Sequence, residues 1–113
     1  MRWILRSKIH KATVTRAEVE YTGSISIDYD LVEKAGLMTG EKVLVVDMTN
    51  GARVETYVIE GERGSGEIGI NGAAAHLIET GDEVIVMGFE LTENQLEPKK
   101  ILVDNKNRFV RYL

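Results

Sequence analysis

Residues 39–46, TGEKVLVV, return in character 41 residues later as residues 80–87, TGDEVIVM. Asp30, expected to cap a short helix, lies 41 residues before Asn71, expected to cap a helical turn. A strand, a short capped helix, a Thr-Gly turn and an apolar strand therefore occur twice. Two such units are too few for a solenoid, but they can close on each other about a pseudo-twofold axis. We favour this repeat over a chance likeness of two amphipathic units, because pattern and caps agree.

Short strands account for most of the remaining pattern. Residues 24–28 alternate between polar and apolar, as in a half-buried strand. Asn50-Gly51 predicts a tight hairpin, because both turn positions favour positive φ. In the returning strand over 53–60, alternation puts Val54, Thr56 and Val58 on one face. Further strands are expected at residues 3–9, 12–14, 43–48, 67–70, 83–89, 101–103 and 109–112.

Size and composition bound the fold and exclude several classes of site. A chain of 113 residues predicts one domain, 1–113, with a single core. The absence of cysteine excludes a disulfide scaffold, a thiolate zinc site and a cysteine nucleophile, and His10 and His76 are too few for a convincing metal site. No apolar run reaches the ~18 residues of a membrane helix. The N-terminus does not resemble a secretory signal, so we expect a cytoplasmic protein without a membrane partner.

Charge is unevenly distributed, although the net charge is only −4. Residues 1–16 hold five basic and no acidic residues, residues 17–97 hold 17 acidic and four basic ones, and residues 98–113 hold five basic and one acidic. The acidic middle repels phosphate backbones, so nucleic acid is not the expected partner. We expect the basic ends to pack against the acidic body of the same or a neighbouring subunit.

Residues 64–69, GSGEIG, match the G-x-G-x-x-G pattern of dinucleotide-binding sites. Such a site needs a strand before the glycines and a full helix that begins within them. Here only one helical turn follows. A glycine-rich connection between strands is therefore the better interpretation, and no nucleotide is expected.

Two other motifs have an open interpretation at this point. Residues 71–76, NGAAAH, join a helix start to small side chains, which suits either close approach of an anion or carbonyl oxygen, or tight core packing. Gly23-Ser24 offers a hydroxyl nucleophile, but neither histidine defines a base for it, and an isolated Gly-Ser most often forms a turn. The same dipeptide occurs again as Gly64-Ser65, and at this point nothing favours one of the two serines over the other as a nucleophile.

Two pairs of polar residues are spaced to share a strand face. Lys8 and His10 are two residues apart, and Arg53 and Tyr57 are four apart. A cation beside a phenol suits a carboxylate ligand that also needs a proton donor. A solvated strand face is the default explanation for each of these residues taken alone.

Five separated motifs occur in a familiar order and spacing. They are KIHKATVT at 8–15, YTGS at 21–24 followed by Ile27-Asp28, NGAR at 50–53 followed by Thr56-Tyr57, ERGS at 62–65, and NGAAAH at 71–76. In these motifs the chain resembles the pyruvoyl-dependent L-aspartate alpha-decarboxylases. The resemblance covers residues 1 to about 90, and the tail from Thr92 is less diagnostic.

The resemblance implies a mainly β fold, a double-psi β-barrel with short helices, which agrees with the 41-residue repeat. It implies a homotetramer with active sites between subunits, which converts L-aspartate to β-alanine and CO2 for pantothenate and coenzyme A synthesis. The chain would cut itself between Gly23 and Ser24, into residues 1–23 and 24–113. Ser24 would become a pyruvoyl cofactor that forms a Schiff base with aspartate. No metal, nucleotide or pyridoxal phosphate is expected.

The resemblance also assigns roles to individual residues. Thr56 would assist cleavage and contact the substrate, Arg53 would grip a substrate carboxylate with its planar fork, and Lys8 would be a second cation. Tyr57 would return a proton to the carbanion, because a phenol with a pKa near ~10 is protonated at neutral pH. The other expected site residues are Asn71, Gly72, Ala73 and Ala74, which would line the pocket, and His10 and Tyr21, which would support the cleavage site.

Two alternatives stay open. A non-enzymatic double-psi barrel would keep the motifs without maturing, and a different pyruvoyl-dependent amino acid decarboxylase would act on another substrate. Retention of Ser24, Lys8, Arg53 and Tyr57 together favours the enzyme. Two cations suit an acidic substrate with two carboxylates.

Overall fold

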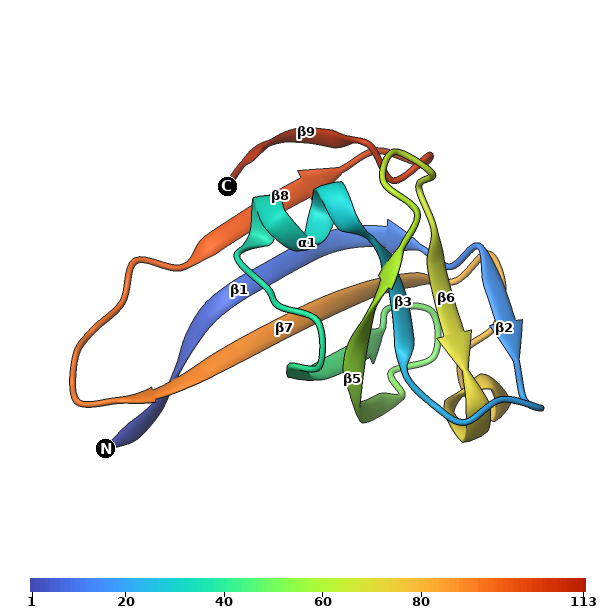
Figure 1. Ribbon diagram of the computed structural model, residues 1–113, viewed down its shortest axis with the longest axis horizontal. Helices are drawn as coiled ribbons and strands as arrows, with labels where there is room; N and C mark the ends of the chain where they lie inside the picture. The colour runs from blue at the N-terminus through green and yellow to red at the C-terminus, as the bar shows by residue number, and fades with distance from the viewer.

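Strand is the main secondary structure of residues 1–113, all of which the computed structural model describes. Figure 1 shows the elements, which are β1 (Arg2–Thr13), β2 (Arg16–Glu18), β3 (Ile25–Asp28), α1 (Tyr29–Ala35), β4 (Lys42–Asp47), β5 (Arg53–Gly61), β6 (Ile68–Asn71), the 3-10 helix η1 (Gly72–His76), β7 (Glu83–Thr92), β8 (Lys99–Val103) and β9 (Phe109–Tyr112). The predicted mainly β fold is confirmed. Two segments expected as separate strands form the single strand β1, and the sequence does not predict β2.

The seven segments β1 to β7 close into a barrel of six strands, because β1 and β2 act as one strand. The strands lie side by side in the order β2-β6-β3-β5-β4-β7-β1-β8-β9. Only two residues separate β1 from β2, and both stay bonded to the sheet, because Val14 N donates to Asp82 O and Thr15 N donates to Ile68 O, each at 2.9 Å. β1 and β2 thus act as one bent strand that pairs with β7 at one end and with β6 at the other. Closure leaves no free edge among these strands, and it agrees with the double-psi barrel.

The strand register supports a pseudo-twofold axis. β4 and β7 are antiparallel, and Val45 lies opposite Val86, its counterpart 41 residues later. A twofold axis that passes between two antiparallel strands pairs equivalent residues in this way. On the other side of the barrel, β3 and β6 are also antiparallel, with Ser26 opposite Gly69. The two Thr-Gly turns match as well, since Gly40 and Gly81 have φ of 89° and 94°.

The caps of the two short helices differ from the prediction. α1 is capped by Asp28 and not by Asp30, because Asp28 Oδ1 accepts a hydrogen bond from Asp30 N at 2.9 Å. The Asp28 carboxylate also accepts from Gly64 N at 2.9 Å and Gly66 N at 2.8 Å, which ties the glycine-rich loop to the helix start. Asn71 stands at the N-cap position of η1, but its side chain makes no capping hydrogen bond. The Asn71 side chain instead donates hydrogen bonds to Ser24 and Ser26.

The β4–β5 hairpin is confirmed, but its turn is not the predicted one. Only Gly51 has positive φ, at 78°, and Asn50 does not. The buried carboxylate of Asp47 holds the loop, since its Oδ1 accepts from Thr49 N at 2.7 Å and from Asn50 N at 3.3 Å. A side-chain acceptor therefore replaces the two-residue turn geometry that Asn-Gly predicts.

One hydrophobic cluster of 19 buried residues fills the barrel and the space beneath α1. In β5, Val58 is buried, Val54 and Thr56 are half-buried, and Arg53 and Tyr57 are exposed, as the alternation predicts. The basic N-terminal segment pairs with acids of the same chain, as expected. Its ion pairs are Met1 N with Glu93, Arg6 with Glu41, and Arg16 with Glu67 and Glu18.

The C-terminal strands extend the sheet beyond the barrel. β8 runs parallel to β1, and β9 pairs with β8. The end of the chain also contacts α1, because Tyr112 Oη donates to Lys34 O at 3.3 Å and Lys34 Nζ lies 4.5 Å from the centre of the Phe109 ring. No helix in the structure has the length and apolar character required to cross a membrane.

Candidate active site

The backbone at Gly23-Ser24 adopts a rare conformation. Gly23 has φ of 110° and Ser24 has φ of 97°, in the region that side chains disfavour. Holding a residue there costs of order 1–3 kcal/mol, and such strain concentrates at functional sites. Ser24 is also buried, with 3% of its surface exposed. A strained, buried serine follows directly after glycine at the start of β3.

The second Gly-Ser dipeptide has none of these properties. Ser65 is exposed and its φ is not positive. Its Oγ donates to Glu62 O at 2.5 Å, which closes an ordinary turn. The structure thus separates Gly23-Ser24 from Gly64-Ser65, which the sequence alone leaves equivalent.

Asn71 holds Ser24 at two points. Its backbone N donates to Ser24 O at 3.0 Å, and its side-chain Nδ2 donates to Ser24 Oγ, also at 3.0 Å. The second hydrogen of Nδ2 goes to Ser26 Oγ at 3.0 Å. Asn71 is itself buried, so its amide is fixed by these bonds and not by solvent.

Gly72 packs directly against Gly23. A Cβ atom at Gly72 would lie 2.8 Å from both Gly23 Cα and Gly23 N, and 3.1 Å from Tyr21 O. Gly72 also has φ of 84°, which favours glycine. Gly72, the first small residue of the NGAAAH motif, therefore allows close approach of backbone to the Gly23-Ser24 peptide. Ala73 is exposed, while Ala74 packs against the core.

Two predicted residues of β5 flank this position. β3 and β5 are parallel, with Ile25 opposite Val58. Continuing that register back by one residue puts Tyr57 level with Ser24, and one more residue back puts Thr56 level with Gly23. Tyr57 is 42% exposed, so its phenol is open to a ligand. The side chain of Tyr21 is exposed, and only its backbone contacts the site.

The structure does not bring the predicted cations to Ser24 within one chain. Arg53 lies four residues before Tyr57, about 13 Å along the strand. Lys8 and His10 lie on β1, with β4 and β7 between them and β5. Lys8, His10 and Arg53 instead share the outer face of the sheet, because the buried side chains of these strands alternate with them.

Apolar side chains separate these cations on the outer face. Arg53 is opposite Val46, and Val46 is opposite Ile85; Lys8 is opposite Met87. The apolar members of this face are Leu44, Val46, Ile85 and Met87, all half-buried. Three strand spacings, roughly 14 Å, separate β5 from β1. Two long cationic side chains thus flank an apolar stripe that this chain leaves partly exposed.

His10 has an unusual environment on this face. Its Nδ1 is buried without a hydrogen-bond partner. Burial lowers the pKa of His10, and the charges of Lys8 and Lys11 lower it further, while Glu83 acts in the opposite direction. The imidazole is therefore held toward its neutral form.

The sequence reasoning missed Arg16. Its Nη1 donates to Asn71 Oδ1 at 2.8 Å, and its Nη2 donates to Glu67 Oε2 at 2.7 Å. These contacts join residues 51 and 55 positions apart, so no local pattern points to them. Ser26 could have been found, since alternation puts its side chain on the same face of the strand as that of Ser24.

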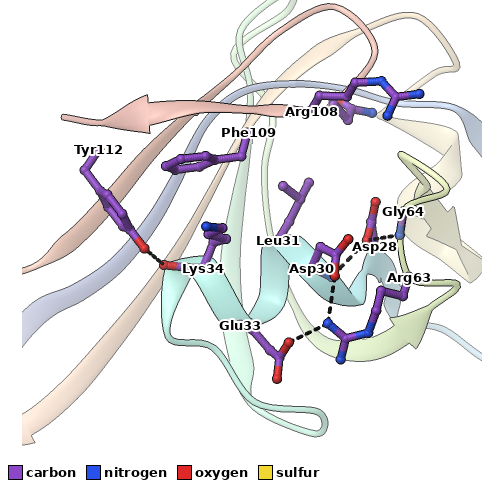
Figure 2. Close-up of a pocket in the computed structure, with 11 residues that line it drawn as sticks. Asp28, Asp30, Leu31, Glu33, Lys34, Arg63, Gly64, Arg108, Phe109 and Tyr112 are labelled. Carbon is purple, nitrogen blue, oxygen red and sulfur yellow. Dashed lines mark hydrogen bonds and ion pairs between the residues drawn. The ribbon is translucent and has the colours of Figure 1, made fainter.

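One surface cavity lies apart from this site. It has a volume of about 610 Å³ and lies between α1 and the C-terminal segment, as Figure 2 shows. Arg63 Nη1 bridges Asp30 at 2.7 Å and Glu33 at 2.6 Å at its rim. Neither Gly23, Ser24 nor any residue of the predicted site lines it. Arg63, Asp30 and Glu33 are thus paired with each other at this cavity, and the strained serine lies elsewhere.

Comparison with known proteins decides the family. The model of the family described as aspartate decarboxylase matches residues 1–110. The chain belongs to the aspartate decarboxylase family. An aspartate 1-decarboxylase from Corynebacterium efficiens is 57% identical over 114 residues, which covers 97% of this chain and 84% of that protein. The resemblance read from the five motifs is confirmed, and the predicted class of enzyme, a decarboxylating lyase, is confirmed with it.

Family membership also extends the resemblance. The match to the aspartate decarboxylase family continues past Thr92, where the diagnostic motifs end, and includes β8 and the start of β9. The C-terminal strands are therefore part of the region that the family shares.

Proposed function

We propose that this chain cuts itself between Gly23 and Ser24 and then decarboxylates L-aspartate to β-alanine and CO2, which supplies pantothenate and coenzyme A synthesis. The single observation that carries the proposal is the buried Ser24 at φ 97°, whose Oγ is held by Asn71. The family supports the reaction, and this geometry supports Gly23-Ser24 as the cleavage point. The products are residues 1–23 and residues 24–113. A cytoplasmic location is part of the proposal and rests on the family alone.

Self-cleavage uses atoms that this chain already holds together. Ser24 Oγ loses its proton and bonds to the Gly23 carbonyl carbon, the C–N bond breaks, and the nitrogen takes the proton, which turns the amide into an ester. Loss of the Ser24 Cα proton then breaks the Cβ–Oγ bond and releases Gly23 as a carboxylate. Water replaces the amine of the resulting dehydroalanine, ammonia leaves, and position 24 becomes a pyruvoyl group. The Gly23 carbonyl is open to attack because glycine has no side chain.

The surroundings of Ser24 fit this group. The serine is buried, and the backbone of Gly72 packs so closely against Gly23 that a side chain at position 72 would not fit. Asn71 offers hydrogen-bond donors to Ser24 O and Oγ. A pyruvoyl ketone supplies an electron sink for the pair released as CO2 departs. Tyr57, level with Ser24 and partly exposed, donates a proton to the substrate carbon. Thr56, which the register of β3 and β5 puts level with Gly23, assists cleavage.

Substrate carboxylates are bound by cations from a second copy of the chain. Arg53 and Lys8 lie on the outer sheet face, away from Ser24 of their own chain. The apolar stripe between them needs a cover, and the same sheet exposes Trp3 by 70% and Leu91 by 44%. We therefore assign active sites to the junctions between subunits of a homotetramer. There Arg53 binds one carboxylate of aspartate, and Lys8 supplies the second positive charge. His10 stays neutral beside Lys8.

Denaturing mass spectrometry of the purified chain tests this function first. We expect two products, with residues 24–113 lighter by one ammonia than the serine-started chain. A Ser24→Ala variant should remain a single chain, whereas Ser65→Ala should be cleaved. The cleaved protein should release β-alanine from aspartate. A chain that stays intact after long incubation would favour a non-enzymatic barrel, and a cleaved chain that acts only on another amino acid would favour a different pyruvoyl-dependent decarboxylase.

A further inference from the structure

The guanidinium of Arg16, a residue of β2, lies against the neighbouring strand β6. Its Nη1 donates to Asn71 Oδ1 at 2.8 Å, and its Nη2 is 2.7 Å from Glu67 Oε2 and 3.4 Å from Ser26 Oγ. β2 and β6 are parallel, with Arg16 opposite Gly69. A Cβ atom at Gly69 would lie 2.6 Å from Arg16 Nη2. The third glycine of the GSGEIG motif therefore makes room for this guanidinium, which gives that motif a structural purpose.

Arg16 dictates which end of the Asn71 amide faces Ser24. A guanidinium only donates hydrogen bonds, so the group that it contacts must be the amide oxygen. The amide nitrogen then points to the two serines and gives one hydrogen to Ser24 Oγ and one to Ser26 Oγ. A reversed amide would set two donors against each other at Arg16. It would also leave no donor for Ser24 Oγ.

Glu67 in turn holds Arg16. The Arg16–Glu67 ion pair is partly shielded, with side-chain exposures of 39% and 28%. Glu18 lies further away, 3.4 Å from Nη1. A planar guanidinium that binds an amide oxygen with one nitrogen and a carboxylate with the other has its orientation fixed. The order of contacts is thus Glu67 to Arg16, Arg16 to Asn71, and Asn71 to Ser24.

We propose that Arg16, oriented by Glu67, is a positioning residue for self-cleavage, which it serves by fixing the Asn71 amide with Nδ2 toward Ser24 Oγ. This inference rests on the self-cleavage proposed above. Nδ2 leaves the hydroxyl hydrogen of Ser24 free to depart during attack on Gly23. When the Cβ–Oγ bond later breaks, the electron pair stays on Oγ in the Gly23 carboxylate, and Nδ2 is already aimed at that oxygen.

The test follows the first-order rate of cleavage in freshly purified full-length chain by denaturing mass spectrometry. Arg16→Met should slow cleavage by about 10- to 100-fold, the effect typical of removing a residue that orients a metal ligand, here applied to a residue that orients the Asn71 amide. Arg63→Met is the matched control, because it removes a guanidinium paired with two carboxylates far from Ser24. It should cleave at the wild-type rate. Arg16→Lys, which keeps a donor, should recover part of the loss.

Two further variants separate positioning from a general structural role. In an Asn71→Ala background, Arg16→Met should cause no additional slowing, because the group through which Arg16 acts is gone. Asn71→Asp keeps an oxygen for Arg16 but has no donor for Ser24, so it should cleave as slowly as Asn71→Ala. Thermal unfolding of each variant checks that it is folded.

Three results would overturn the inference. These are wild-type cleavage rates in Arg16→Met, equal slowing by Arg16→Met in the presence and absence of Asn71, and rapid cleavage by Asn71→Asp. If wild-type chain itself stays intact, the proposed function fails, and this inference fails with it. If wild-type chain is cleaved and Arg16→Met matches it, only the role of Arg16 is wrong.

Discussion

The contact between Gly72 and Gly23 gives a sharp test of the cleavage site. Gly72→Ala would add a Cβ atom 2.8 Å from Gly23 Cα and N. Packed carbon atoms normally lie about 3.5–4.0 Å apart, so the two backbones must separate by about 1 Å. Alanine at the φ of 84° costs about 1–2 kcal/mol, and overpacking adds about 1–3 kcal/mol. We expect a total loss of about 2–5 kcal/mol in the free energy of unfolding.

Displacement of Gly23 should also slow self-cleavage. A misplacement of about 1 Å between reacting groups can cost about 100-fold in rate, so we expect a slowing of that order. The cleavage rate is measured by denaturing mass spectrometry on fresh precursor. The free energy of unfolding is measured by urea denaturation in a Ser24→Ala background, at one protein concentration, so that all chains are intact and any association is constant.

Gly81→Ala is the matched control. Gly81 has φ of 94°, but a Cβ atom there meets nothing within 4 Å. The free energy of unfolding of Gly81→Ala should fall only by the cost of the backbone conformation, about 1–2 kcal/mol, and the variant should cleave at the wild-type rate. Equal destabilisation by the two substitutions, or wild-type cleavage in Gly72→Ala, would refute the argument that Gly72 sets the position of the scissile peptide.

Three further predictions concern the catalytic step and the effect of pH. Arg53→Ala should still cleave itself but lose aspartate turnover per cleaved chain; retained β-alanine release would sink the assignment of Arg53 to a carboxylate. Tyr57→Phe should likewise mature, and its turnover should fall by about 10²- to 10⁴-fold if the phenol is the proton donor, while an unchanged rate would exclude it. Burial raises the pKa of the Asp47 carboxyl above its ordinary value of 3.8, and Asp82 adds to the rise. A raised pKa in the folded state means that the folded chain holds this proton more tightly than the unfolded chain does. The free energy of unfolding therefore falls as pH increases through that pKa and Asp47 ionises. Asp47→Asn should therefore gain stability relative to wild type between acidic and neutral pH in urea denaturation, and a difference that stays constant with pH would contradict this account.

Local patterns in the sequence determined most of the fold. Alternation predicts the faces of β5, the 41-residue repeat predicts paired units, and burial and register agree with both. These features depend on neighbouring residues and on turn chemistry, which a sequence displays directly. The errors at the helix cap and the hairpin turn are local competitions between acceptors. Asp28 caps α1 in place of Asp30, and Asp47 replaces the predicted turn at Asn50-Gly51, because each carboxylate can bind several backbone N–H groups.

For the site, sequence motifs named the family and the residue types, and only the tertiary structure decided how they are used. Gly23-Ser24 and Gly64-Ser65 are identical as dipeptides, and in the folded barrel only Ser24 is buried with a positive φ, whereas Ser65 is exposed. Arg16 meets Asn71 across 55 residues, and the outer sheet face separates Lys8 and Arg53 from Ser24. Such contacts arise from the path of strands around the barrel, which no short window of sequence contains. That is why the motifs identified the chemistry, whereas the closed barrel determined which serine is held, by which amide, and on which strands Lys8 and Arg53 lie relative to that serine.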